Sequence, residues 1–235
     1  MKLGIMQPYF FPYLGYFQLI HAVDRYVFLD TTQYVRRSWM NRNRIINLKE
    51  GTTYITVPLM KSSFNSSLKD QVPGDSMDWR NVIISQLGIY RKRSPYFNHV
   101  MDMVKSVLYS DFTTLSRLNM NSVEFCLDYL GISFKYDVFS KMEIDLPDNL
   151  KGDECTLFIT KALGYCHYVN APGGVSFYDK EKYSAHGVTL SFLQPNLKPY
   201  IQKIDRFESG LSIIDVLMFN SINDVKIMLS DYSFF

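Results

Sequence analysis

A proline stands just behind a short apolar run near the start of the chain, and this limits what the first thirty residues can form. Residues 3–6 are too few for a helix, while Pro8 lacks a backbone donor and favours an extended Gln7. A strand should therefore end here. Apolar residues at helical spacing follow over 16–22, and a second β-favouring run covers 26–29. This order predicts a strand, a crossover helix and a second, parallel strand.

Ligands of such βαβ units bind beyond the carboxyl ends of the strands, where loop backbone and a helix N-terminus converge. In this chain that edge would collect Gln7, the aromatic loop 9–15 and Asp30. We therefore expect a pocket there, with Asp30 inside it as a ligand anchor or proton acceptor. The alternative role of a strand-end aspartate is to cap a turn. His21, within the expected helix, is the second candidate proton acceptor, and an ordinary interior or surface histidine is its alternative.

The rest of the chain alternates strands and helices, which is typical of an α/β domain with a mainly parallel sheet. A hairpin with its turn at 49–52 is followed by three helical segments within 77–130, which we interpret as a helical insertion. Later strands are expected over 132–136, 167–169 and 188–192, and later helices over 154–163, 178–183 and 211–218. The predicted fold class is therefore α/β, a Rossmann-like, mainly parallel sheet in one domain that spans 1–235.

Composition excludes several classes of protein. A formal net charge of +2 gives no electrostatic argument for nucleic acid. Three cysteines without CxxC spacing form neither a disulfide framework nor a recognisable zinc site, and they fit a reducing compartment. No apolar run approaches the roughly 18 residues of a membrane span, and no signal peptide opens the chain. We expect a soluble, cytoplasmic protein without a metal site, membrane insertion or nucleic-acid partner.

Familiar catalytic motifs are missing. The sequence contains no GxxxxGK[ST], GxGxxG, GxSxG or HExxH, which argues against a P-loop enzyme, a Rossmann dehydrogenase, an α/β-hydrolase and a zinc protease. The turn at 12–16 is similar at fold level to that of nucleotidyl-transfer enzymes, which place (H/T)xGH there. Tyr13 and Tyr16 occupy the two histidine positions in this chain. A nucleotidyl-transferring or adenylating enzyme therefore stays an alternative.

Four arginines fall within 36–44, a stretch that has no acidic side chain. A guanidinium group offers a planar fork of donors that suits phosphate or carboxylate, so this block is expected to hold the phosphates of a ligand. The alternative is a solvated surface hairpin. Aromatic side chains nearby could stack on a base or a sugar. The residues predicted to bind substrate are Gln7, Tyr9, Tyr13, Tyr16, Gln33, Arg36, Arg37, Trp39, Asn41, Arg42, Asn43 and Arg44.

Three separated blocks of the sequence resemble the WbqC-like protein family. They contain the runs QPYFFPYLGYF from residue 7, WMNRN from residue 39, and YIQ and LSIIDVL from residues 200 and 211. The resemblance spans essentially the whole chain. One departure is Asn220-Ser221, where a glycine is expected after the last helix.

This resemblance implies a place in bacterial surface-polysaccharide synthesis, especially that of the O-antigen of lipopolysaccharide. It implies action on an activated sugar that carries an amino group, without identifying a catalytic residue. The leading hypothesis is a transferase that modifies a nucleotide-linked amino sugar by N-acyl or N-aminoacyl (for example glycyl) transfer, with an acyl-carrier thioester as donor and partner. A non-catalytic sugar-nucleotide binding or assembly protein is the alternative from another class.

Overall fold

A six-stranded sheet forms the centre of the molecule within the residues that the computed structural model describes, which are 1–235 except 49–50, 64, 76–77, 149 and 151. The strand order is β5-β2-β1-β6-β7-β8. Five strands are parallel, and β8 pairs antiparallel with β7. The expected α/β class with a mainly parallel sheet is confirmed. The strands are β1 Leu3–Met6, β2 Arg25–Phe28, β5 Asp137–Val138, β6 His167–Asn170, β7 Thr189–Pro195 and β8 Tyr232–Phe234.

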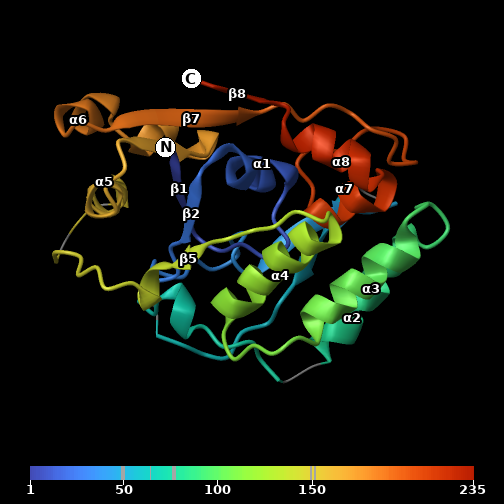
Figure 1. Cartoon of the computed structure of the whole chain (residues 1–235). Coiled ribbons are helices and arrows are strands. Elements are labelled where there is room, and N and C mark those ends of the chain that lie inside the picture. Colours follow the sequence, from blue (N-terminus) through green and yellow to red (C-terminus); the bar gives the residue numbers. More distant parts are fainter. Residues whose placement is uncertain (49–50, 64, 76–77, 149, 151) are drawn as a thin grey trace.

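Alternate side chains of β1 and β2 enter two hydrophobic cores, one on each face of the sheet, because successive strand residues point to opposite sides. Leu3, Ile5 and Val27 share a core with α5 (Gly152–Ala162) and α6 (Lys180–Ala185). Tyr26 and Phe28 share the other core with α1 (Leu14–Ala22). Figure 1 shows α1 and α5 on opposite sides of β1 and β2. Both faces are therefore covered, as the near-continuous apolar strands require.

The helical insertion consists of α2 (Trp79–Leu87), α3 (Phe97–Leu108) and α4 (Leu115–Tyr129), which lie together in Figure 1. Residue 77, where the insertion was expected to begin, lies outside the described residues. Thr114 caps α4 by accepting a hydrogen bond from the backbone N–H of Arg117. The apolar stripes of these helices pack into the α1-side core. The insertion therefore extends one core of the sheet.

A separate antiparallel hairpin joins β3 (Arg42–Ile46) to β4 (Thr52–Thr56). The expected hairpin is thus confirmed, although residues 49–50 of its turn lie outside the described residues. Because β3 begins at Arg42, half of the arginine block lies on a strand, and Arg36 and Arg37 lie on the loop before it.

Two parts of the sequence-based prediction were wrong or incomplete. The strand expected over 132–136 is irregular, and only Asp137–Val138 after it pairs with β2. The apolar side chains of 132–136 still pack against the core, so their alternation reflects burial without pairing. The prediction also missed β8 and the helix before it. The remaining elements are α7 Ile213–Phe219, α8 Ile222–Leu229 and the 3-10 turns η1 Leu68–Asp70, η2 Gly88–Tyr90, η3 Phe139–Lys141 and η4 Pro172–Phe177.

Candidate ligand-binding site

A cavity of about 950 Å³ opens at the carboxyl edge of the parallel strands, where the sequence predicted a pocket. Its wall combines the ends of β1, β2 and β6 with the first turns of α1 and α5 and the η4 turn. Its polar side chains are Gln7, Tyr9, Tyr13, Tyr16, Thr31, Thr32, Gln33, Trp39, Cys155, Thr156, Asn170 and Tyr178. None of its described lining residues carries a formal charge. Amides, hydroxyls and aromatic faces of this kind suit a neutral, hydroxyl-rich ligand.

A second cavity of about 310 Å³ adjoins the first, and its wall includes one positively charged side chain. Three aromatic residues, Tyr9, Tyr13 and Trp39, line both cavities and form the boundary between them. The remaining lining residues of the smaller cavity are Pro12, Asn43, Arg44 and Gly210. A ligand could therefore extend from a neutral chamber into a positively charged one.

The loop between β1 and α1 is held by side chains from three distant elements. Asn43 on β3 donates to the carbonyl oxygen of Phe11 at 2.7 Å, and Ser212 at the start of α7 donates to the same oxygen at 2.8 Å. On α4, the hydroxyl of Ser122 accepts from the backbone N–H of Phe11 at 3.0 Å. Phe11 is fully buried and has a φ of 40°, an uncommon backbone conformation for a residue other than glycine. These contacts fix the loop before any ligand binds.

Gln7 is oriented by two tyrosines. The Tyr16 hydroxyl donates to the backbone oxygen of Gln7 at 2.9 Å, and the Tyr9 hydroxyl donates to its Oε1 at 3.0 Å. The Nε2 of Gln7 donates to no described residue, so it is available to a ligand in the cavity. Burial raises the pKa of Tyr9 to about 12 and raises the pKa of Tyr16 well above its ordinary value. Both hydroxyls therefore stay protonated near neutral pH and act as donors.

Gly15 explains how Tyr13 reaches both cavities. A Cβ at Gly15 would lie 2.5–2.6 Å from atoms of the Tyr13 ring, far inside contact distance. The ring therefore lies over the first turn of α1 only because residue 15 has no side chain. Burial also raises the pKa of Tyr13, which keeps its hydroxyl protonated.

The structure distributes the four arginines unequally. Arg44 lines the smaller cavity, with its guanidinium 5.7 Å from the ring centre of Trp39. Arg42 stacks 4.1 Å above the ring of Tyr54 and lines neither of the two cavities. Arg36 and Arg37 are exposed on the preceding loop and line neither cavity.

The two asparagines of this block have structural contacts. Asn41 donates from its side-chain amide to the carbonyl oxygen of Val57 at 3.1 Å, and it lines neither cavity. Asn43 lines the smaller cavity, although its Nδ2 is engaged by the loop carbonyls of Phe10 and Phe11. Gln33 lies on the wall of the larger cavity and forms a bridge with Ser67. Of these three, Gln33 is the one on the wall of the larger cavity, and its Nε2 also donates to the Oδ1 of Asn65 at 3.5 Å.

Asp30 does not lie inside the pocket as expected, although its neighbour Thr31 lines the larger cavity. Its carboxylate is 3% exposed and accepts hydrogen bonds from the backbone N–H of Ser140 at 3.0 Å and from the Ser140 hydroxyl at 2.6 Å. These contacts tie β2 to the η3 turn. The position therefore supports the alternative role, a structural cap, since both carboxylate oxygens are already engaged.

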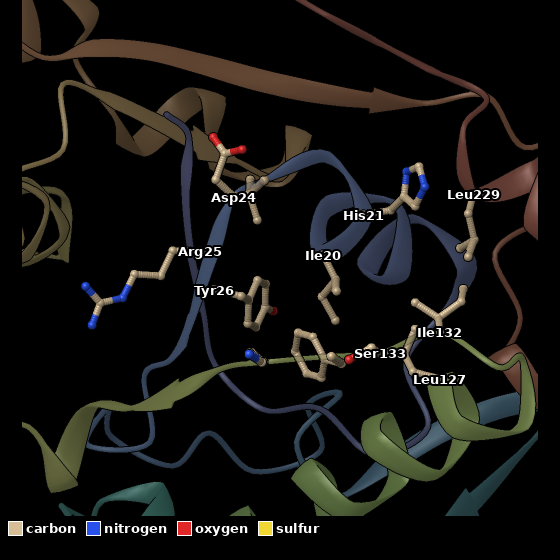
Figure 2. A pocket seen from close by; sticks show the side chains of 12 residues that line it. Ile20, His21, Asp24, Arg25, Tyr26, Leu127, Ile132, Ser133 and Leu229 are labelled. Atoms are coloured by element: carbon tan, nitrogen blue, oxygen red, sulfur yellow. The ribbon is translucent and has the colours of Figure 1, made fainter.

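His21 lies at the other end of α1, away from the carboxyl edge. It borders a hollow of about 360 Å³ that lies by the start of β2 and also contains Ile20 and Tyr26. Figure 2 shows His21 pointing away from both of those side chains. Because ligands of parallel α/β sheets bind at the carboxyl ends of the strands, we assign no ligand to this hollow.

Sequence reasoning missed the residues that other elements bring to the larger cavity. Asn170 ends β6 beside β1, is 5% exposed and accepts from the N–H of Ala171 at 2.8 Å. A Cβ at Gly174 would lie 2.5 Å from the Nδ2 of Asn170, so this glycine is needed for the close approach of η4. Cys155 and Thr156 arrive from the first turns of α5. The position of Asn170 directly after the strand predicted over 167–169 was the available signal.

The third sequence block, which contains YIQ from residue 200 and LSIIDVL from residue 211, lines neither cavity but holds the loop that does. Asp215 on α7 is fully buried, and its carboxylate accepts from Tyr90 at 2.7 Å, Tyr200 at 2.6 Å and Gln202 at 2.8 Å. Burial raises the pKa of this carboxyl group above its ordinary value. No described cation pairs with it, so the three donors stabilise its charge. This network fixes α7, whose cap Ser212 binds the loop between β1 and α1.

Comparisons with known proteins agree with the sequence blocks. The model of the WbqC-like protein family matches residues 7–227. The chain is 29% identical over 219 residues to a Mycobacterium tuberculosis protein called Uncharacterized protein Rv1507c, covering 92% of each chain. No solved structure gives a significant match to this chain. No helix among the described residues has the length and apolar character needed to cross a membrane.

Proposed function

The chain belongs to the WbqC-like protein family, and on this premise we propose that it transfers an acyl or aminoacyl group to the amine of a nucleotide-linked amino sugar. The resemblance implies a place in O-antigen synthesis and action on an activated sugar that carries an amino group. The observation that carries the proposal is the large cavity at the carboxyl edge, whose described wall has amides, hydroxyls and aromatic rings but no charge. Those groups match the hydroxyls and apolar faces of a sugar.

The chemistry places modest demands on the protein. An uncharged amine attacks an activated acyl carbonyl, and a well-oriented pair of reactants can supply much of the rate enhancement. Gln7 offers its Nε2 as a hydrogen-bond donor, and the protonated hydroxyl of Tyr13 is a further donor that could orient a carbonyl or stabilise its developing charge. With a thioester donor the carbon–sulfur bond breaks as the carbon–nitrogen bond forms, and the departing thiolate can take up the proton that the amine loses.

One observation favours the second candidate, a sugar-nucleotide binding or assembly protein without catalysis. The described wall of the larger cavity contains neither a carboxylate nor an imidazole, so it has no ordinary general base. Asp30 and His21 do not supply one there, for the reasons given above. The two candidates share the same ligand and differ only in whether it is changed.

The direct test is to incubate the purified chain with nucleotide-linked amino sugars and acyl or aminoacyl thioesters, and to follow the mass of the sugar. A gain of one acyl group supports transfer. Binding without any change of mass supports the second candidate, and release of pyrophosphate would instead support nucleotidyl transfer.

A variant pair links the activity to this site. Trp39→Ala removes an aromatic ring shared by both cavities, and stacking on such a ring contributes about 1–3 kcal/mol, so transfer should fall about tenfold. Tyr109→Ala is the matched control, because Tyr109 is also exposed and lines neither cavity. Equal losses in both variants would contradict the placement of the site.

A further inference from the structure

The smaller cavity contains a positive charge that has no counter-ion among the described residues. Arg44 forms an ion pair with no described residue. Its Nε is buried and has no hydrogen-bond partner in the described part of the chain, and its Nη2 makes a 3.4 Å contact with the carbonyl oxygen of Gly210. A partly buried guanidinium whose Nε has no described partner is costly, because burial removes part of its hydration and the long contact with Gly210 replaces only part of it. An anionic ligand would remove this cost.

The backbone that carries Arg44 is fixed before a ligand arrives, and the side chain has two contacts. The backbone oxygen of Arg44 accepts from Ser212 at 2.9 Å, which ties β3 to α7. Its side chain lies between the ring of Trp39 and the backbone of Gly210. A planar fork fixed in this way can engage two oxygens of one phosphate group.

The two cavities also differ in chemistry in a way that matches one kind of ligand. The larger has no charge on its described wall. The described wall of the smaller has Arg44 and no acidic residue, and three aromatic side chains border both. A ligand that has a neutral polar part and an anionic part fits this arrangement. The neutral part would occupy the larger cavity, the anionic part would contact Arg44, and the link between them would cross the border formed by Tyr9, Tyr13 and Trp39.

We propose that the Arg44 cavity is a phosphate subsite, and that the phosphate is attached to the molecule whose neutral part occupies the larger cavity. The second clause rests on the proposed function, whereas the subsite itself does not. Arg44 is then the phosphate anchor of the arginine block. Arg36, Arg37 and Arg42 are not, because none of the three lines either cavity, although the Nε of Arg42 is also buried without a described partner.

The test is calorimetric titration of the full chain with inorganic pyrophosphate, a nucleoside diphosphate and phosphopantetheine. The wild-type chain should bind pyrophosphate, and Arg44→Gln should weaken binding about tenfold or more, the effect of a lost charge-assisted hydrogen bond. Arg42→Gln, on the same strand, and Arg36→Gln should change affinity less than about twofold. Arg44-dependent binding of the nucleoside diphosphate assigns the phosphate to the sugar nucleotide, and such binding of phosphopantetheine assigns it to the acyl carrier.

Three results would overturn the subsite: no binding of any phosphate, no effect of Arg44→Gln, or an equal effect of Arg36→Gln. If Arg44→Gln does not fold, Arg44→Lys replaces it, because lysine keeps the charge and lacks the planar fork. Weaker binding by that variant supports the subsite, and unchanged binding contradicts it. No acyl donor is present in these titrations, so phosphate binding and acyl transfer can succeed or fail separately.

Discussion

The side-chain amide of Asn119 donates a 2.9 Å hydrogen bond to the carbonyl oxygen of Pro8, across 111 residues of sequence. The same nitrogen donates to the carbonyl oxygen of Met40 at 2.7 Å. One buried residue of α4 therefore joins the loop after β1 to the segment that precedes β3. Both segments carry residues of the two cavities, so the helical insertion supports the site without lining it.

Asn119→Ala should destabilise the chain by about 2–4 kcal/mol, because it leaves two buried carbonyl oxygens without donors. Urea unfolding followed by circular dichroism measures this loss. Asn223→Ala, at an exposed position of α8, is the control and should stay near wild type. A loss at Asn119 no larger than that of the control would show that the loop does not depend on α4.

Gly15→Ala should weaken ligand binding about tenfold while α1 remains formed. The new Cβ would displace the Tyr13 ring from its place at the border of the cavities, and a lost aromatic contact is worth about 1–3 kcal/mol. Titration with the nucleotide-linked sugar measures the effect. Gly88→Ala is a suitable control, since nothing lies within 4 Å of the Cβ it would add. Unchanged affinity in Gly15→Ala would remove Tyr13 from the binding surface.

Cys155 should react with iodoacetamide slowly, and its rate should rise only at a higher pH than that of an ordinary thiol with a pKa of about 8.5. Burial raises the pKa of Cys155, so less of the reactive thiolate is present at a given pH. A ligand in the larger cavity should slow the reaction further, because Cys155 lines it. Mass spectrometry of each cysteine peptide, with exposed Cys166 as internal control, tests both statements. Ligand protection confined to Cys166 would contradict them.

Asp215 should make the folded state less stable as pH rises. Its pKa is raised by burial in the folded state, so the folded chain holds this proton more tightly than the unfolded chain. The resulting stability is fully present below the unfolded pKa of about 3.9 and is lost as pH rises through the folded pKa. Asp215→Asn cannot titrate. As pH rises through the mildly acidic range, the free energy of unfolding of the wild type should therefore decrease relative to that of the variant. A relative increase would contradict the raised pKa of Asp215.

The fold was largely predictable because its elements are encoded locally. Pro8 after the first apolar run fixed where β1 ends, and the helical spacing after residue 15 located α1 to within two residues. The failures have a physical cause. Residues 132–136 alternate like a strand because their apolar side chains reach the core, yet pairing with β2 occurs only at Asp137–Val138. The strand β8 has only the residues 232–234 and is partly exposed, so its sequence has no apolar pattern that would predict a strand.

The site was predictable only where chain order places residues at the sheet edge. Gln7, Tyr9 and Tyr13 follow β1 directly and do line the cavity. Residue type alone could not separate Arg44, which lines a cavity, from Arg42, which stacks on Tyr54. The same limit applied to Asp30, since its bond to Ser140 joins residues 110 positions apart.

The central claim is that one ligand occupies both cavities at the carboxyl edge, and a crystal structure of the chain with a nucleotide-linked amino sugar tests it most directly. The account predicts the sugar in the larger cavity beside Gln7 and Asn170, and a phosphate group within hydrogen-bond distance of Arg44. A ligand bound instead in the hollow beside His21, or one whose phosphates contact Arg36 and Arg37 without Arg44, would contradict it.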